Sequence, residues 1–292
     1  MFGIIGIVIV FGAVIGGFLS EHGNLKVLMQ PAELLIIGGA SIGTILIANP
    51  IAVLKGIAAA LPGVFKPSKF DKASYLTILT QLNRVMQKAR KQGLAALEPE
   101  VDKPEASELF KDIEHHLRNF ICDTLRVAMA GDPSPYDLDQ LMELDMEVHH
   151  HEAHQPVEAL TTVADALPGL GIVAAVLGVV ITMGALGGPP EEIGHKVAAA
   201  LVGTFLGILL CYGLLGPIAS KMGKDADEAG HVYHTVRVAV ISFMKGSSPL
   251  IALEFARRVT PGHARPSFSE LESACRAKGA AAPAAVPEAS AA

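Results

Sequence analysis

Four neighbouring histidines form the group of side chains in this sequence that most resembles a metal site. They are His149, His150, His151 and His154. On a helix, His150 and His154 share one face because they are four residues apart. The zinc motif H-E-x-x-H needs a glutamate directly after its first histidine, whereas Glu152 follows His150 by two positions. We therefore interpret the cluster as a solvated patch and predict no bound metal.

A run of charged side chains is the second group whose residue types could do chemistry. It contains Arg90, Lys91, Glu98, Glu100, Asp102 and Lys103. Most runs of this kind are only the solvated face of a helix. The same side chains could also dock a charged partner, because complementary charges orient two proteins as they meet. The residues alone leave both interpretations open.

Three motifs of common enzyme classes are missing from the sequence. It contains no phosphate-binding loop, no G-x-G-x-x-G fingerprint and no CxxC pair. The formal net charge of −6, without a basic stripe and interleaved aromatic residues, argues against nucleic acid as a partner. The cysteines, Cys122, Cys211 and Cys275, are too few and too scattered for a disulfide framework. We predict that the protein is not an enzyme and needs no cofactor.

Four uncharged stretches are expected to form the helices that position the histidine cluster and the charged run. The chain is 51% hydrophobic and only 18% charged, which departs from soluble globular proteins. The stretches cover residues 1–20, 34–54, 166–190 and 197–220, and each is long enough to cross a bilayer as a helix. The first lacks the basic start and cleavage site of a signal peptide, so we expect it to be retained. The predicted fold class is an all-α polytopic membrane protein with four transmembrane helices and a cytoplasmic helical domain between helices 2 and 3.

The four stretches contain no Asp, Glu, Lys, Arg or His. A protein that carries protons through a membrane normally places an ionisable side chain there, despite the energetic cost. If this chain moves ions, the titrating group must therefore come from another chain. The same composition argues against an intramembrane protease or metal enzyme.

Lysine and arginine predict the orientation of the chain. Residues 61–160 contain eleven of them, whereas the short connections contain only Lys26 and Lys196. By the positive-inside rule, the central segment and both termini lie in the cytoplasm. We divide the chain into a transmembrane hairpin (1–60), a cytoplasmic helical domain (61–160), a second transmembrane hairpin (161–222), a cytoplasmic C-terminal helical segment (223–276) and a disordered tail (277–292).

Apolar periodicity predicts the helices of the cytoplasmic domain. One helix covers residues 75–89, with Gly93 placed to end it, and a second runs from about 107 to 130. A third helix begins near Asp137 and can continue into the third uncharged stretch. Together these helices are expected to form a compact bundle.

Small residues recur at four-residue spacing in the uncharged stretches. They are Gly12 and Gly16, Gly39 and Gly43, Gly203 and Gly207, and also Gly171, Ala174, Ala175 and Gly178. Such faces let helix backbones approach closely within a bilayer. Any one pair of small residues can be explained by packing within the chain. The large number of such pairs favours contacts with partner chains as well.

Two prolines interrupt the second hairpin. Pro168 lies in the first turns of the third stretch, and Pro217 lies near the end of the fourth. Each removes a backbone donor and can kink a helix. The local sequence fits a helix start at Pro168 and a helix stop at Pro217. The more specific alternative is that the prolines form a hinge.

Five motifs follow one another along nearly the whole chain: QPAEL at 30–34, LPGLGIVAA at 167–175, VGTFLGIL at 202–209, EFARR at 254–258 and RPSF at 265–268. In this order they resemble the motifs of the MotA family, the A subunits of bacterial flagellar stators. Only the Ala/Pro tail falls outside the resemblance. Several long motifs in the right order are a specific signal.

The resemblance implies an assembly and a place in the cell. In that family five A subunits surround two copies of a B subunit, MotB, whose single membrane helix supplies the aspartate that binds the ion. Ion flow is thought to turn the ring of A subunits, which then pushes on the rotor protein FliG. The chain is accordingly expected in the bacterial inner membrane, as a subunit that couples ion flow to torque.

The resemblance also assigns roles to residues. The torque-transmitting charges of the family match Arg90 and Glu98, and its two functional prolines match Pro168 and Pro217, which favours the hinge. Sodium-driven relatives carry a hydroxyl residue where Ala175 stands, and hard cations favour oxygen ligands, so the expected ion is H⁺. A threonine that faces the ion site in both groups matches Thr204.

Two alternatives to a flagellar stator subunit remain at this point. One is an energising subunit like TolQ or ExbB, which belong to the same superfamily but have three spans. The fourth span and the region from Arg90 to Glu98 favour the flagellar interpretation. The other alternative is a membrane scaffold that conducts nothing, which would tolerate changes of its surface charges.

Overall fold

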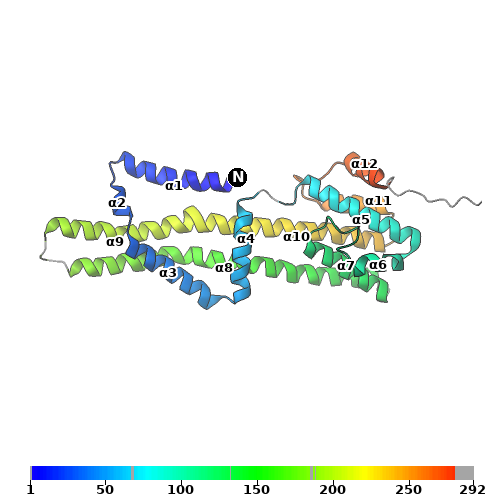
Figure 1. Cartoon of the computed structure of the whole chain (residues 1–292), viewed down its shortest axis with the longest axis horizontal. Helices are drawn as coiled ribbons and strands as arrows, with labels where there is room; N and C mark the ends of the chain where they lie inside the picture. The colour runs from blue at the N-terminus through cyan, green and yellow to red at the C-terminus, as the bar shows by residue number, and fades with distance from the viewer. Residues whose placement is uncertain (1, 67–68, 132, 185–186, 188, 280–292) are drawn as a thin grey trace, which may run out of the picture. The chain divides into compact units, whose positions relative to one another are not determined.

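The structure, a computed structural model, describes residues 2–66, 69–131, 133–184, 187 and 189–279. Every regular element in those ranges is a helix (Figure 1). Four helical segments among them are long and apolar enough to cross a membrane. The predicted all-α class with four transmembrane helices is therefore confirmed. The chain divides into two compact units.

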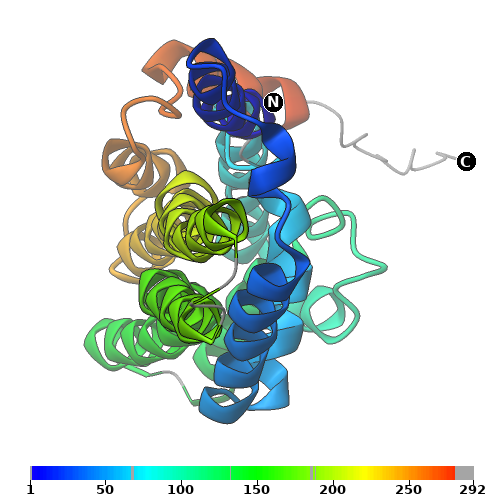
Figure 2. The same ribbon diagram turned by 90° about the vertical axis from the view of Figure 1, so that its left-hand side faces the viewer.

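Unit 1 consists of Met1–Pro67 and His151–Ala226. Its first part contains α1 (Phe2–Ser20), α2 (Leu25–Leu28), α3 (Pro31–Ala48) and α4 (Ile51–Val64). Its second part contains the end of α8 (Pro135–Met183), α9 (Pro190–Leu210), the π-helix η2 (Cys211–Leu215) and the start of α10 (Gly216–Met244). Figure 2 looks along α8 and α9 and shows α3 beside them.

The second predicted span, residues 34–54, is wrong at both ends. Helix α3 begins at Pro31, which suits the first helical position because its missing N–H would have no partner there. The helix ends before Asn49, which the following Pro50 holds in an extended conformation with φ −130° and ψ 142°. The chain resumes as the separate helix α4. Glu33 consequently lies inside the second apolar helix and not in the connection before it.

Much of the apolar surface of unit 1 is not covered by the chain itself. No residue in the span Gly3–Ser20 is buried. On α3, Leu35 is 75% exposed and Ile47 is 89% exposed. Contiguous apolar faces of this size mark contacts with a membrane or with partner proteins. The surface of unit 1 is thus suited to contact with a lipid bilayer or with partner chains.

Unit 2 consists of Ser68–His150 and Asp227–Ala292. Its helices are α5 (Lys72–Gln92), η1 (Leu94–Leu97), α6 (Glu98–Asp102), α7 (His115–Gly131), the start of α8, the end of α10, α11 (Pro249–Val259) and α12 (Phe268–Gly279). They enclose one apolar core that includes Tyr75, Phe110, Val236 and Leu253. Burial in this core raises the pKa of Tyr75 to about 12. Unit 2 therefore has the core of an ordinary globular helical domain.

Two of the predicted helices of this unit are confirmed. The helix predicted over residues 75–89 is α5, whose first turn is capped by Asp71, since its Oδ1 accepts the amide of Ser74 at 2.9 Å. Gly93 ends the helix with a φ of 84°, which favours glycine. The helix predicted from about Asp137 into the third span is α8.

The helix predicted from about 107 to 130 is wrong in its first part. Helix α7 begins only at His115. The Glu114 carboxylate caps it by accepting the amides of His116 at 2.9 Å and Leu117 at 3.1 Å. The preceding residues form turns whose apolar side chains, Leu109, Phe110 and Ile113, are buried in the core. Apolar periodicity therefore found core residues here but not the start of the helix.

Part of the predicted tail is helical. Helix α12 continues to Gly279, so residues 277–279 belong to it. Residues 280–292, the rest of the predicted disordered tail, lie outside the described residues.

The motif at 254–258 holds the C-terminal part of unit 2 together. The Glu254 carboxylate accepts hydrogen bonds from Arg257 Nε at 2.7 Å and Arg258 Nε at 2.9 Å. Arg257 Nη1 in turn donates to the carbonyl oxygen of Pro266 at 3.1 Å. The bond from Arg257 is the main reason why the pKa of Glu254 falls to about 2.

Glu254→Gln is expected to lower the Tm by a few degrees at neutral pH, because it removes charge-assisted hydrogen bonds that together contribute about 1–2 kcal/mol. Since the pKa falls from 4.5 to about 2 on folding, this stabilisation is complete above pH 4.5 and is lost as the pH drops toward 2. Thermal melts followed by circular dichroism should show the variant and wild type converging over that range. Glu272→Gln, which loses only a pair with the exposed Arg276, is the control. A Tm difference that stays constant down to pH 2 would contradict the assignment.

Candidate ion-conducting site

Helices α8 and α9 meet at a crossing built from glycines. A Cβ atom at Gly171 would lie 2.7 Å from the carbonyl oxygen of Gly203. A Cβ atom at Gly207 would lie 2.5 Å from the carbonyl oxygen of Leu167. Side chains do not tolerate such contacts with backbone atoms, so glycine alone permits this approach. We call this contact the glycine crossing, and it confirms internal packing as one role of the small residues.

The glycines of α1 and α3 lack such neighbours. A Cβ atom at Gly12, Gly16, Gly39 or Gly43 would meet nothing within 4 Å among the described residues. These small faces are open for the close approach of other helices. Their contact with partner chains stays a prediction.

The two residues predicted to line the ion pathway both lie at the glycine crossing. The backbone nitrogen of Ala175 would be 3.2 Å from a Cβ atom at Gly203, and the Cα of Thr204 would be 3.3 Å from one at Gly171. Both residues are half-buried. The Ala175 side chain is a methyl group and the Thr204 side chain has a hydroxyl group, and neither group titrates. That they face an ion stays a prediction.

Glu33 is an ionisable residue that the hydropathy pattern placed outside the spans. In α3 it is only 6% exposed. A Cβ atom at Gly203 would lie 2.6 Å from its Oε2 atom, and one at Gly178 would lie 3.5 Å from its Oε1 atom. The prediction that the spans contain no ionisable side chain is therefore wrong for the second apolar helix. Pro31 was the available signal, since a proline at the first helical position places Glu33 in the first turn.

Both predicted hinge prolines lie inside continuous helical runs. Pro168 is in the interior of α8. Pro217 follows the π-helix η2, in which the N–H of Gly216 donates to the carbonyl oxygen of Cys211, and the run continues as α10. A π-turn often marks a functional site within a helix. The interpretation of the prolines as a helix start and a helix stop is therefore wrong, and the hinge stays a prediction.

Arg90 and Glu98 lie on either side of the chain turn at Gly93 in unit 2. Arg90 is in the last turn of α5, Glu98 is the first residue of α6, and both are exposed. The structure gives neither side chain an ion pair among the residues that it describes. Arg90 lines an open groove of about 510 Å³ with Lys91 and Arg276, whereas Glu98 lies outside it. Glu272 also lines the groove, where it pairs with Arg276 at 2.7 Å, so the lining has three basic side chains and one acidic side chain.

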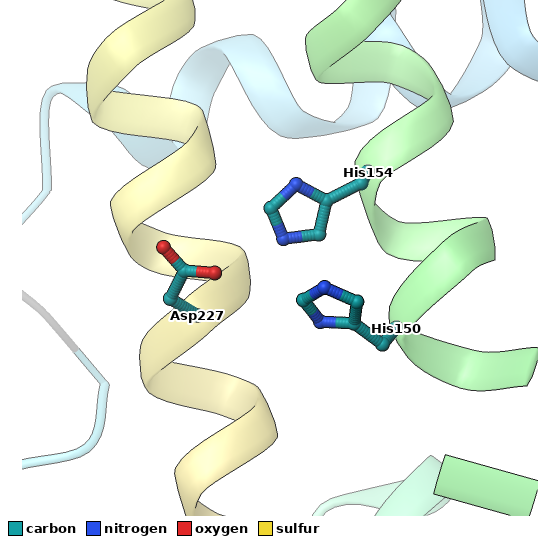
Figure 3. Close-up of side chains that lie close together, drawn as sticks. All are labelled: His150, His154 and Asp227. Carbon is teal, nitrogen blue, oxygen red and sulfur yellow. The ribbon is translucent and has the colours of Figure 1, made fainter. Parts of the chain in front are cut away.

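The histidine cluster lies on α8. Figure 3 shows His150 and His154 on this helix and Asp227 on α10. His150 and Asp227 are exposed, and His154 is half-buried. Exposed imidazole and acidic side chains often gather on a surface without a metal. We therefore retain the interpretation of the cluster as a solvated patch.

Comparison with known proteins identifies the chain. Residues 4–93 match the family model described as "Motility protein A N-terminal", and residues 112–234 match "MotA/TolQ/ExbB proton channel family". Motility protein A of Escherichia coli strain K12 is 40% identical over 279 residues, which are 94% of this chain and 95% of that protein. The chain belongs to the motility protein A family. Within this family it is also similar to the chemotaxis protein LafT of Vibrio parahaemolyticus, at 34% identity over 92% of this chain and 96% of that protein.

Two solved structures share the fold of this motility protein A chain. One is described as "Structure of C. jejuni MotAB", with a TM-score of 0.76 at 20% identity, covering 91% of this chain and 98% of that chain. The other is the flagellar MotAB stator complex from Bacillus subtilis, with a TM-score of 0.70 at 26% identity, covering 86% of this chain and 92% of that chain.

The comparisons confirm the predicted family and the predicted general function. As a member of the motility protein A family, the chain is a stator subunit of the flagellar motor and belongs to a family of proton channels. Its apolar helices and its family make it a multi-pass protein of the bacterial inner membrane. The relatives named above are a motility protein and a chemotaxis protein, which favours the flagellar interpretation over an energising subunit like TolQ or ExbB.

Proposed function

We propose that this chain assembles with a B subunit into a complex that conducts protons and exerts torque on the rotor. The glycine crossing carries the proposal, because Ala175 and Thr204 lie there without contributing a titratable group. A B subunit supplies the aspartate that the pathway needs, and both structural neighbours are MotAB complexes. The open glycine faces of α1 and α3 suit a ring of five A subunits around two B subunits.

The orientation of the complex follows from the distribution of lysine and arginine. Unit 2 and both termini lie in the cytoplasm, and the short connections that contain Lys26 and Lys196 lie outside. In this orientation Arg90 and Glu98, which are exposed and make no ion pair among the described residues, contact the rotor protein FliG. Pro168 and Pro217 act as hinges between the ion pathway and the rest of the chain.

The transported ion in this proposal is the proton. Sodium is a hard cation that favours oxygen ligands. The Ala175 side chain offers no oxygen to a dehydrated sodium ion. The Thr204 hydroxyl can hydrogen-bond a water molecule or hydronium ion beside it.

Proton leak tests this function directly. Cells that express the chain with its B partner, after removal of the periplasmic plug of that partner, should acidify, as a pH-sensitive dye would report. Thr204→Ala is expected to reduce the leak several-fold, because a positioned hydroxyl is lost from the pathway. Thr161→Ala is the control, since Thr161 is exposed and its hydroxyl only donates to the carbonyl oxygen of Val157. The absence of any leak from the wild-type complex would contradict the proposed function.

A further inference from the structure

Glu33 is a buried group that the proposed function leaves without a role. It is 6% exposed, and its Oε2 atom has no hydrogen-bond partner within the described part of the chain. Burying a polar group without a hydrogen bond is energetically costly, and burying an unpaired carboxylate costs more. A side chain with only a packing role would be apolar or paired. The orphan oxygen therefore points to a ligand.

Two glycines make room for the Glu33 carboxyl group. Gly203, whose Cβ would lie 2.6 Å from Oε2, belongs to α9, and Gly178, whose Cβ would lie 3.5 Å from Oε1, belongs to α8. The carboxyl group thus lies against both helices that form the glycine crossing. The backbone nitrogen of Ala175 would lie 3.2 Å from the same Cβ of Gly203. Glu33 is therefore a neighbour of the predicted ion pathway.

An open cavity of about 750 Å³, which we call the vestibule, reaches to within about one helical turn of Glu33. Its lining includes Gln30, three residues before Glu33, and Ala199, four residues before Gly203. The vestibule is open and partly polar, so water can fill it. Glu33 consequently lies between a space that water can fill and the backbone of the glycine crossing.

The ionisable groups around the vestibule come from two elements. They are Lys26 on α2 and Glu191, Glu192, His195 and Lys196 on α9. Lys196 already pairs with Glu192 at 3.0 Å. Residues 34–48 of α3 and 166–183 of α8 contain no ionisable side chain. Glu33 is thus the acid at which the polar lining gives way to the uncharged helices.

We propose that Glu33 is a proton-binding site of the A subunit itself, which takes up a proton from the vestibule before the proton passes to the glycine crossing. A hydronium ion donates H⁺ to the carboxylate, which leaves water and a neutral carboxylic acid. Release of that proton to the next water molecule or acidic group restores the carboxylate. The step needs no further reactant. The inference rests on the proposed proton conduction and adds a second protonation site to that of the B subunit.

Leak measurements on the plug-free complex test this inference. Glu33→Gln keeps the size of the side chain but cannot release a proton, so the leak should fall by about tenfold or more. Glu33→Asp should restore part of it, and Glu21→Gln, at an exposed acid outside the vestibule, should leave it unchanged. Wild-type leak in Glu33→Gln would overturn the inference while leaving the proposed function intact. Absence of leak in the wild-type complex would instead contradict the proposed function.

Chemical labelling of the wild-type complex decides the matter if Glu33→Gln fails to assemble. Hydrophobic carbodiimides attach to buried carboxyl groups in their protonated form. Mass spectrometry should find the adduct on the peptide that contains Glu33, with a labelling rate that rises as the pH falls. A Glu33 peptide that stays unlabelled at both acidic and neutral pH would overturn the inference.

Discussion

The double charge reversal Arg90→Glu with Glu98→Lys is expected to abolish swimming while stator assembly and proton leak persist. Both side chains are exposed and make no ion pair among the described residues, so their reversal removes nothing that holds unit 2 together. At a contact with a charged rotor surface, each reversal turns attraction into repulsion. Together they should cost on the order of 2–4 kcal/mol of docking free energy. Swimming speed and the amount of assembled stator in the membrane are the measurements.

A swapped ion pair elsewhere in unit 2 is the matched control. Glu108 and Lys111 form an exposed ion pair at 2.6 Å, so Glu108→Lys with Lys111→Glu keeps both the pair and the net charge. Cells with this variant should swim normally. Normal swimming with the Arg90 and Glu98 reversals would contradict the rotor contact and favour a scaffold that tolerates surface charges.

Local signals made parts of the fold predictable. Asp71 and Gly93 act within one turn of the ends of α5, so residues close in sequence determine where that helix begins and ends. The start of α7 was missed because apolar periodicity at Leu109 and Ile113 marks burial in the core, and burial does not require helix. The Glu114 cap decides the start, and capping by a glutamate directly before a helix is a weak signal in sequence.

The candidate site was predictable only in part. Small residues at four-residue spacing indicated that helices can approach closely, and the structure shows this contact between α8 and α9, with Ala175 and Thr204 where they meet. Glu33 was missed because hydropathy excludes a charged residue from a span, whereas its burial depends on room left by Gly178 and Gly203 on other helices. Such room is a tertiary property, and no spacing along α3 encodes it.

Both prolines lie close to the glycine crossing along the chain, Pro168 within α8 and Pro217 at the start of α10. Pro168 directly follows Leu167, whose carbonyl oxygen lies where a Cβ of Gly207 would clash. Gly207 precedes the π-helix η2, and Pro217 follows it. The tight contact leaves little freedom for the helices to slide, so a change in this region is expected to occur as bending at the points where backbone hydrogen bonds are missing.

Pro217→Ala is expected to abolish torque without loss of stability. Proline at this position lacks the N–H that would bond the carbonyl oxygen of Gly213, and the π-turn that ends at Gly216 accommodates this gap. Alanine restores the donor, so the run from α9 to α10 can close into a regular and stiffer helix. Proline inside a helix costs about 3 kcal/mol relative to alanine, so the Tm of the variant should stay unchanged or rise. Rotation of tethered cells and thermal melts of the purified complex measure the two effects.

Pro190→Ala separates this effect from the general consequences of losing a proline. Pro190 is exposed and is the first residue of α9, where its missing N–H interrupts no hydrogen bond, so rotation should persist. The helix can lose its bend without losing its packing. A Pro217→Ala complex that is stable and leaks protons but does not rotate would therefore locate the coupling step at η2. Rotation at wild-type speed in Pro217→Ala would show that torque does not pass through a hinge at this position.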